Sequence, residues 1–339
     1  MKARNEIKRR RALIIIPALL IVLIGCFLIL PLFESPEINS VAGSADWMKN
    51  VPDSTPLNMI ALPGTHDSAA EYVFPAFFAR CQSRSISEQL NDGFRYLDIR
   101  LGVESGNDKV ALDLMHGSAF CRKKLSPSSG KLRLDSVLAQ CYAFLDLHPH
   151  ETVVFTVSRE NGDESVSSFE NLLNSYVSQD PEYWLLTNSI PTLGEARGKL
   201  VLMRRYPDAA GLGAASGIPA YWEDQSGFDD PDLNYERCVA ENITLWVQDR
   251  YEFDSSEKWL AFLTTLGTCP ADYDRGELCI NFLSTKGTLT YGHPYGYAKT
   301  LNGQLSALAE KSGSPNGWII LDFGTPELAQ RIYSANFES

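Results

Sequence analysis

The sequence lacks several patterns that would assign it quickly to a known class. No CxxC pair occurs in its 339 residues, so a structural zinc site is a poor interpretation. No segment repeats at a fixed period and no low-complexity tract interrupts the main body, which favours one domain over an array of repeats. The glycine-rich stretch GLGAASG, residues 211–217, has neither the preceding strand nor the following helix of a dinucleotide-binding turn, so it is predicted to be a flexible loop.

Positive charge is also scarce once the first eleven residues are set aside. Residues 1–11 contribute +5, whereas the whole chain carries −12, so the remainder carries −17. An acidic body of this size argues against nucleic acid as a partner and against electrostatic adsorption to an anionic membrane face. The expected partner is a neutral or small ligand, or a lipid that the chain reaches through a tether.

The N-terminus carries the longest apolar run. Ala12 to Leu30 is uncharged after four consecutive basic residues, and as a helix it would be about 28 Å long, close to the hydrocarbon thickness of a bilayer. We expect a basic cytoplasmic tail at 1–11, a signal anchor at 12–33, a linker at 34–56 and an extracytoplasmic barrel at 57–339. Val41-Ala42-Gly43 is a passable cleavage site, so secretion after cleavage stays open.

Cysteine usage fits an exported domain. One cysteine, Cys26, lies in the apolar segment, and the other six form an even set, as expected where disulfides persist. Up to three bridges are possible, and spacing alone leaves the pairing open. The set consists of Cys81, Cys121, Cys141, Cys238, Cys269 and Cys279.

Apolar strand-like runs alternate with helical patterns along the body, which predicts an α/β fold with a parallel sheet covered by helices. Eight runs suggest a (β/α)8 TIM-type barrel, with an open doubly wound sheet as the alternative. The predicted strands are 59–62, 96–101, 111–115, 152–157, 199–203, 243–247, 278–283 and 318–321. The predicted helices are 134–147, 166–177, 257–266, 298–309 and 326–335.

Polar residues stand at the end of most of these strands or directly after them. In a (β/α) barrel the carboxyl ends of all strands meet on one face, so these residues are expected to converge there. Each has an ordinary structural explanation as a cap, a turn or an ion pair, but together the acids, bases and arginines suit a site that acts on a phosphate. They are His66, Asp67, Asp98, Arg100, His116, Ser158, Arg159, Glu160, Arg204, Arg205, Gln248, Asp249, Arg250, Tyr251 and Asp322. His148 and His150 precede a strand and are predicted to be structural.

Several ordered motifs together resemble the bacterial-type phosphatidylinositol-specific phospholipases C and their fungal relatives across about residues 55 to 336. They are LPGTHDS, SRSISEQLNDGFRYLDIRL, LMHG, HPHETVVFTV, GEARGKLVLMRRY, VQDRY and GWIILDF. The resemblance implies a distorted (β/α) barrel. It also implies cleavage of phosphatidylinositol to diacylglycerol and inositol cyclic phosphate without a metal or another cofactor.

The same resemblance implies roles for named residues. His66 would be the general base, oriented by Asp322, and His116 with Asp67 would form the general acid. Arg100 would hold the phosphate oxygens. Four further residues are implied to bind substrate: Arg159, Arg205, Asp249 and Tyr251.

One departure from the family pattern affects substrate choice. The family usually has a lysine after its fourth strand, whereas this chain has Ser158 followed by Arg159, and the two cations place their donors differently. A glycosylphosphatidylinositol or another phosphodiester is therefore an alternative substrate, and an inositol-lipid-binding module with weak catalysis is a second alternative. The calcium-dependent relatives place acids where Arg100 stands, which favours the metal-free subtype here. No protein partner is implied.

Overall fold

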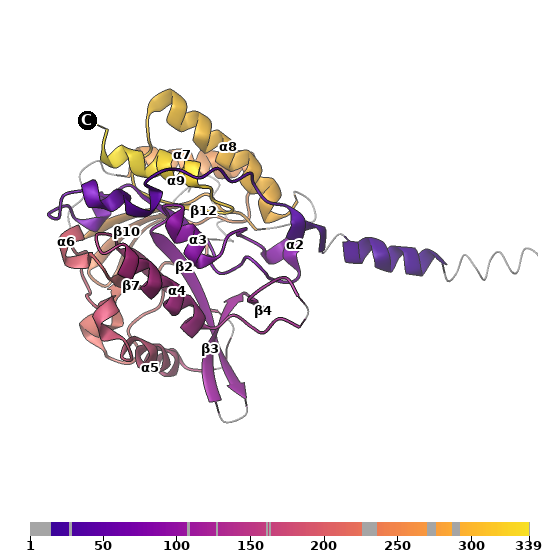
Figure 1. Cartoon of the computed structure of the whole chain (residues 1–339), viewed down its shortest axis with the longest axis horizontal. Coiled ribbons are helices and arrows are strands. Elements are labelled where there is room, and N and C mark those ends of the chain that lie inside the picture. The colour runs from indigo at the N-terminus through magenta and orange to yellow at the C-terminus, as the bar shows by residue number, and fades with distance from the viewer. Residues whose placement is uncertain are drawn as a thin grey trace, which may run out of the picture.

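The structure is a computed structural model that describes residues 15–26, 29–106, 109–126, 128–160, 162, 164–225, 236–269, 276–286 and 292–338. The predicted cytoplasmic tail, residues 1–11, lies outside the described residues. Figure 1 shows a sheet surrounded by helices, with one apolar helix that projects from the body at its N-terminal side.

A mainly parallel sheet forms the centre of the molecule. Its strands run in the order β6-β7-β5-β2-β1-β12-β11-β10-β9, with β8 beside β7 and only β9 antiparallel along this path. Strands that the sequence predicted as apolar runs are buried on both faces, as in the central β5, because helices cover the sheet outside and side chains fill it inside. The strands are β1 (Leu62–Thr65), β2 (Tyr96–Gly106), β5 (Val153–Arg159), β6 (Trp184–Leu185), β7 (Leu200–Arg204), β8 (Ile218–Pro219), β9 (Glu236–Ala240), β10 (Ile243–Gln248), β11 (Glu277–Phe282) and β12 (Trp318–Leu321).

The α/β prediction is confirmed, but the closed eight-stranded barrel is not. Within the described residues, no backbone ladder joins the β7–β8 side of the sheet to the β9–β10 side. The chain from Ile218 to Gln225 lies at this opening, where the Gln225 side chain donates to the carbonyl of Val247 and accepts from the amide of Asp249. Side chains thus bridge the opening where strand pairing stops.

The predicted third barrel strand is also wrong in its direction. β3 (Lys109–His116) runs antiparallel to β2, with Gly106 opposite Lys109, and continues into the short β4 (Ala119–Phe120). Two antiparallel strands can be joined by a tight turn, whereas a parallel pair needs a crossover of about a dozen residues or more. β2 extends well past the YLDIRL run, so too few residues remain between β2 and β3 for that crossover.

The first strand begins three residues later than predicted. Met59 lies in the 3-10 helix η3 (Leu57–Met59), and β1 includes Pro63-Gly64, which the sequence indicated as the end of the strand. A Cβ at Gly64 would lie 2.5 Å from the side chain of Ile320 and 2.8 Å from that of Tyr96. Gly64 is therefore required by the close approach of neighbouring strands rather than by a turn.

Helices cover the outer surface of the sheet (Figure 1). All five predicted helices are present, and α4 buries the six apolar residues of its predicted face. The α-helices are α2 (Ala76–Ala79), α3 (Ile86–Asn91), α4 (Leu134–Leu147), α5 (Val166–Val177), α6 (Leu193–Ala196), α7 (Ser255–Thr268), α8 (Pro294–Ser312) and α9 (Pro326–Tyr333). The remaining 3-10 helices are η1 (Leu30–Phe33), η2 (Ser44–Asn50), η4 (Pro181–Tyr183), η5 (Gly213–Ser216) and η6 (Ser334–Asn336).

The predicted linker, 34–56, is partly packed on the barrel. Trp47 and Met48 of η2 are buried in the core. The buried guanidinium of Arg95 donates to the carbonyls of Ser44 and Ala45 and forms an ion pair with buried Glu151 at 2.8 Å. Residues from 44 onward therefore belong structurally to the barrel. Before them, a helix over Ile15–Phe33 is long and apolar enough to cross a membrane.

One disulfide, Cys269–Cys279, joins the end of α7 to β11. Cys81, Cys121 and Cys141 are buried thiols in the described structure. Cys81 and Cys121 lie close to the strand ends that carry the candidate site.

Candidate active site

The first histidine is fixed by two adjacent parallel strands. β1 and β12 pair in register, so His66 and Asp322, which follow them, emerge side by side, and His66 Nδ1 lies 2.8 Å from Asp322 Oδ1. Gln82 donates to the carbonyls of His66 and Leu321 and fixes this strand end. Arg100 Nη2 lies 2.8 Å from His66 Nε2. Because a guanidinium only donates, Nε2 carries the lone pair and the proton on Nδ1 faces Asp322.

The second histidine, at the end of β3, pairs with the residue next to His66. His116 Nδ1 lies 2.9 Å from Asp67 Oδ2 and 2.8 Å from the carbonyl oxygen of Ala79. Both are acceptors, so Nδ1 carries a proton and Nε2 is the ring atom left to exchange one. Burial lowers the pKa of His116, but the charge of Asp67 and the hydrogen bond to it outweigh this and raise the pKa.

A left-handed backbone at Asp67 directs the two neighbours to different partners. Its φ is +39°, which is unusual for a residue with a side chain, and its amide donates to Asp98 Oδ2 at 3.0 Å. His66 thus faces Asp322 while Asp67 faces His116. The two imidazole rings lie edge to face with centroids 6.3 Å apart.

Arg100 lies beside both histidine–carboxylate pairs, 2.8 Å from His66 Nε2 and 3.9 Å from Asp67 Oδ2, and holds a fixed positive charge. Its Nε lies 3.0 Å from Asp98 Oδ2, and its Nη1 lies 3.2 Å from Glu160 Oε1. Burial raises the pKa of Asp98, but Arg100, His66 and Arg205 together outweigh it and lower the pKa to about 2. Asp98 is therefore ionised at neutral pH and anchors Arg100.

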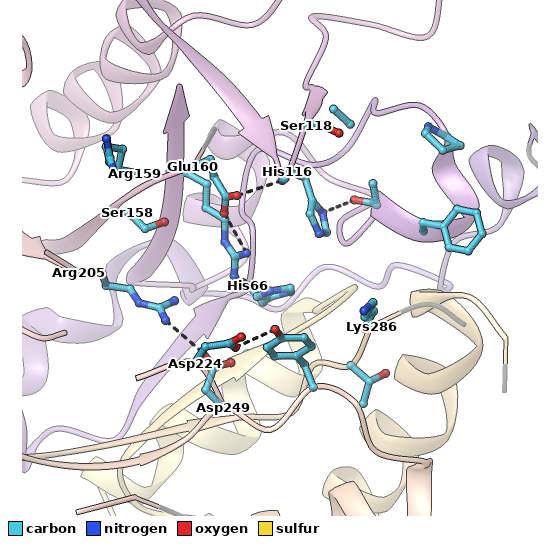
Figure 2. Close-up of a pocket in the computed structure, with 18 of the residues that line it drawn as sticks. His66, His116, Ser118, Ser158, Arg159, Glu160, Arg205, Asp224, Asp249 and Lys286 are labelled. Atoms are coloured by element: carbon cyan, nitrogen blue, oxygen red, sulfur yellow. Dashed lines mark hydrogen bonds and ion pairs between the residues drawn. The ribbon is translucent and has the colours of Figure 1, made fainter. Parts of the chain in front are cut away.

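The opposite wall carries a second arginine on an aromatic surface. Arg205 Nη2 lies 3.2 Å from Asp249 Oδ2, and its guanidinium carbon lies 3.8 Å from the centre of the Trp222 ring. Trp222 Nε1 also donates to Asp249 Oδ2, at 3.1 Å, and Tyr251 donates to Asp224 Oδ1. Figure 2 shows Arg205 and Asp249 across the cavity from His116 and Glu160.

A cavity of about 770 Å³ opens between these walls. The structure brings together all the residues that the sequence singled out for chemistry or binding. Seven line the cavity: His66, Arg100, His116, Arg159, Arg205, Asp249 and Tyr251. The other two, Asp67 and Asp322, lie behind the histidines with side chains almost completely buried. Neither His148 nor His150 lines the cavity, and His148 pairs with Asp46 near η2.

Arg159 lines the cavity, but its guanidinium lies close to its own loop. It donates to the carbonyl of Glu164 and lies 3.8 Å from the carboxylate of the same residue. To contact a ligand in the cavity, this guanidinium has to leave Glu164 first. Its predicted role in substrate binding stays a prediction.

Sequence reasoning missed residues that shape the cavity. Glu160 accepts hydrogen bonds from Arg100 and from the amide of Gly117. The sequence places Glu160 after a strand but indicates no role for it. Trp222 and Asp224 lie in a loop with no periodic pattern, so no sequence signal pointed to them. Lys286, which also lines the cavity, follows β11 by a few residues and could have been included by the same strand-end rule.

In the part of the chain that the structure describes, two groups of side chains have the spacing of metal ligands, and both include Cys81. One combines it with His66 and Asp322, the other with Asp67 and His116. In each group the histidine already bonds a carboxylate through its Nδ1. Burial raises the pKa of Cys81 well above its usual value, so the thiol stays protonated, and Arg100 already supplies the positive charge next to His66. The donor set therefore suits proton transfer better than a resident cation.

Comparisons with known proteins found a matching family and several similar proteins. Residues 65–206 match the family described as phosphatidylinositol-specific phospholipase C, X domain. The chain is 28% identical over 326 residues to a 1-phosphatidylinositol phosphodiesterase of Staphylococcus aureus, covering 90% of this chain and 96% of that protein. It is 30% identical over 182 residues to a protein of the same name from Listeria monocytogenes, covering 50% of this chain and 51% of that protein.

Solved structures share the fold. The phosphatidylinositol-specific phospholipase C from L. monocytogenes superimposes with a TM-score of 0.65 at 23% identity, over 87% of this chain and 99% of that one. A variant of the S. aureus enzyme gives a TM-score of 0.70 at 23% identity, over 86% and 96%. The family match and the two histidine–carboxylate pairs beside one arginine identify residues 65–206 as a phosphatidylinositol-specific phospholipase C X domain.

Proposed function

We propose that the chain cleaves phosphatidylinositol, or a related inositol phospholipid, to diacylglycerol and inositol 1,2-cyclic phosphate. The supporting observation is that two histidines, each bonded to its own buried carboxylate, face one cavity that Arg100 also lines. Such a pair provides a base and an acid for the two proton transfers that phosphodiester cleavage by an internal hydroxyl requires. The reaction needs no metal in this proposal.

His66 acts as the base in this mechanism. Its Nε2 lone pair takes the proton of the inositol 2-hydroxyl while the oxygen attacks phosphorus, and Asp322 stabilises the imidazolium that forms. The hydroxyl is already attached next to the phosphate, so the attack is intramolecular and benefits from a high effective molarity. To accept the proton, Nε2 exchanges its contact with Arg100 for one with the hydroxyl.

His116 acts as the acid. The bond between phosphorus and the glycerol oxygen breaks, and His116 Nε2 gives that oxygen the proton that completes diacylglycerol. Asp67 favours the protonated form of His116, which is the form that an acid needs before the reaction.

Arg100 offsets the charge that grows on the phosphate oxygens. It is held by Asp98 and Glu160, so it does not have to reorganise during the reaction. The groove formed by Arg205, Asp249 and Tyr251 receives the inositol, whose hydroxyls are hydrogen-bonded by the charged groups while the Tyr251 ring packs against the sugar face. The catalytic domain is extracytoplasmic in this proposal.

Phosphorus NMR tests the reaction directly. The full chain is incubated with phosphatidylinositol in mixed micelles with excess chelator, and a cyclic phosphate resonance is expected. His66→Ala and His116→Ala should each reduce turnover by about a hundredfold or more, the range for a lost acid or base. Loss of all turnover on chelation would refute the metal-free mechanism, and a non-cyclic first product would refute attack by the 2-hydroxyl.

A substrate panel separates the alternatives. After the fourth predicted strand this chain has Ser158 followed by Arg159, where the family usually has a lysine. The kcat/KM value for a glycosylphosphatidylinositol is therefore compared with that for phosphatidylinositol. Faster turnover of the glycosylated lipid would change the substrate and keep the mechanism. Inositol binding without turnover of any lipid in the panel would favour a binding module.

A further inference from the structure

A buried arginine connects the rim of the cavity to the end of the apolar helix. Arg80 is 5% exposed, and its Nη1 donates to the carbonyl of Pro31 at 2.7 Å and to the carbonyl of Glu34. Its Nε donates to the carbonyl of Glu71 at 3.1 Å. Two of its three acceptors therefore precede the candidate cleavage site at 41–43. Cleavage there would leave a buried cation without both of them, which is costly.

A second contact holds the same junction from another side. Glu34 Oε2 lies 3.1 Å from His293 Nε2, and the His293 ring lies against that of Phe77 in α2, with centroids 5.6 Å apart. η1 packs against α2, and α2 packs against α8. Residues 30–34 are therefore attached to the body rather than forming a free tether.

This junction lies at the cavity entrance. Pro75, Phe78 and Ala79 of the α2 region line the cavity. Next to them the structure leaves large apolar side chains exposed, with Phe74 at 53% and Phe33 at 69%. Figure 1 shows the apolar helix projecting from the body beside α2. Exposed apolar groups continuous with a helix of membrane-spanning length fit one occupant, a lipid bilayer.

We propose that the N-terminal helix is retained and that its docked end fixes the cavity entrance at the surface of the bilayer that carries the chain. Lipid substrate is then drawn from that same bilayer. This inference rests on the proposed function for its substrate and adds an orientation that a flexible linker would not give. A docked anchor raises the effective concentration of lipid in its own bilayer at the entrance, whereas a flexible tether lets the entrance face any direction.

Reconstituted vesicles test the orientation. The full chain is inserted into phosphatidylcholine vesicles, and labelled phosphatidylinositol is placed either in the same vesicles or in separate ones. Turnover in the same vesicle is expected to exceed turnover between vesicles by about tenfold or more. A water-soluble inositol phosphodiester measures the activity that does not depend on the bilayer.

Two variants separate docking from folding. Arg80→Gln removes the connection, and a flexible insertion of about ten Gly and Ser residues between Ile29 and Leu30 keeps every Arg80 contact but frees the membrane helix. Both should lower the same-vesicle advantage, since the tether remains but the orientation of the entrance is lost, while keeping turnover of the soluble substrate. Arg331→Gln, which removes a surface ion pair with Glu310, is the matched control and should keep the advantage.

Hydrogen exchange gives a readout without turnover. The peptide covering residues 72–80 should be protected in vesicles relative to detergent, and the insertion should remove that protection. A purified chain whose N-terminus begins after Gly43 would overturn the inference, as would an unchanged same-vesicle advantage in the insertion variant. Protection without turnover of any inositol lipid would instead support the docking and refute the proposed function.

Discussion

Asp67 should act on turnover mainly through His116, although its neighbour in the chain is His66 and Arg100 Nε lies 3.9 Å from its carboxylate. Asp67 Oδ2 lies 2.9 Å from His116 Nδ1, while Asp322 Oδ1 lies 2.8 Å from His66 Nδ1. A hydrogen bond to a charged partner contributes about 1.5–3 kcal/mol, so Asp67→Asn should reduce kcat/KM by about a hundredfold. His116→Ala should reduce it by about a thousandfold.

The double variant tells the two assignments apart. If Asp67 works through His116, the variant lacking both should be no slower than His116→Ala alone, a coupling of about 2.7 kcal/mol. The matched cycle combines Asp67→Asn with Asp322→Asn, which belong to opposite proton transfers, and the two losses should multiply to about ten-thousandfold.

The assay is release of diacylglycerol from mixed micelles in chelator at fixed pH, with kcat/KM measured for all members of both cycles. Additive losses for Asp67 and His116, within about 0.5 kcal/mol, would refute the assignment of Asp67 to the acid. Strong coupling of Asp67 to Asp322 would refute the separation of the two pairs. The soluble phosphodiester serves as a second substrate to exclude effects on lipid binding.

Three further outcomes are expected. Asp67→Asn should move the alkaline limb of the pH profile of kcat/KM to lower pH. Asp67 raises the pKa of His116, and the acid form of His116 is lost as the pH rises through that pKa. If the limb stays in place in the variant, a group other than His116 is responsible for it. Glu151→Gln should reduce the free energy of unfolding in urea by about 3–5 kcal/mol, since it leaves Arg95 buried without its anion, and a loss below 1 kcal/mol by the same measure would mean that other groups neutralise Arg95. Burial lowers the pKa of Lys258 from 10.5 to about 7. Between these pH values the free energy of unfolding of the wild type should therefore rise with pH relative to that of Lys258→Met, by at most about 1.4 kcal/mol per pH unit. Urea midpoints of the two proteins that run parallel across this range would refute a neutral buried amine.

Much of the fold followed from periodicity. The run TVVFTV forms β5, and the apolar face of Leu134–Leu147 forms the buried side of α4. Both could be predicted because each pattern depends only on which residues of that one segment are buried. The start of β1 could not be predicted, since Gly64 in the strand depends on the side chains of Ile320 and Tyr96 from distant parts of the chain. Strand direction at β3 depended on where β2 ends, and apolar content does not determine that.

The site followed from a rule about topology. Residues after parallel strands share one face, which brought His66, Arg100 and Asp322 together from distant parts of the sequence. The same rule gave no information on Trp222, because it lies in a loop, or on the local contact of Arg159 with Glu164. Such contacts depend on side-chain positions that no periodic pattern encodes.

The opening in the sheet gives the two halves of the cavity unequal stiffness. The histidine pairs lie beside β1, β2 and β12, which backbone ladders join continuously. Arg205 and Asp249 face each other across the opening, where, among the described residues, side chains rather than a ladder connect β7 to β10. Within the described residues, widening this seam breaks the Arg205–Asp249 ion pair, the Trp222 contacts and the Gln225 hydrogen bonds but no strand ladder, and the contacts that hold the two histidines lie outside it. The width of the cavity can therefore change at a place that is mechanically separate from the two histidine–carboxylate pairs.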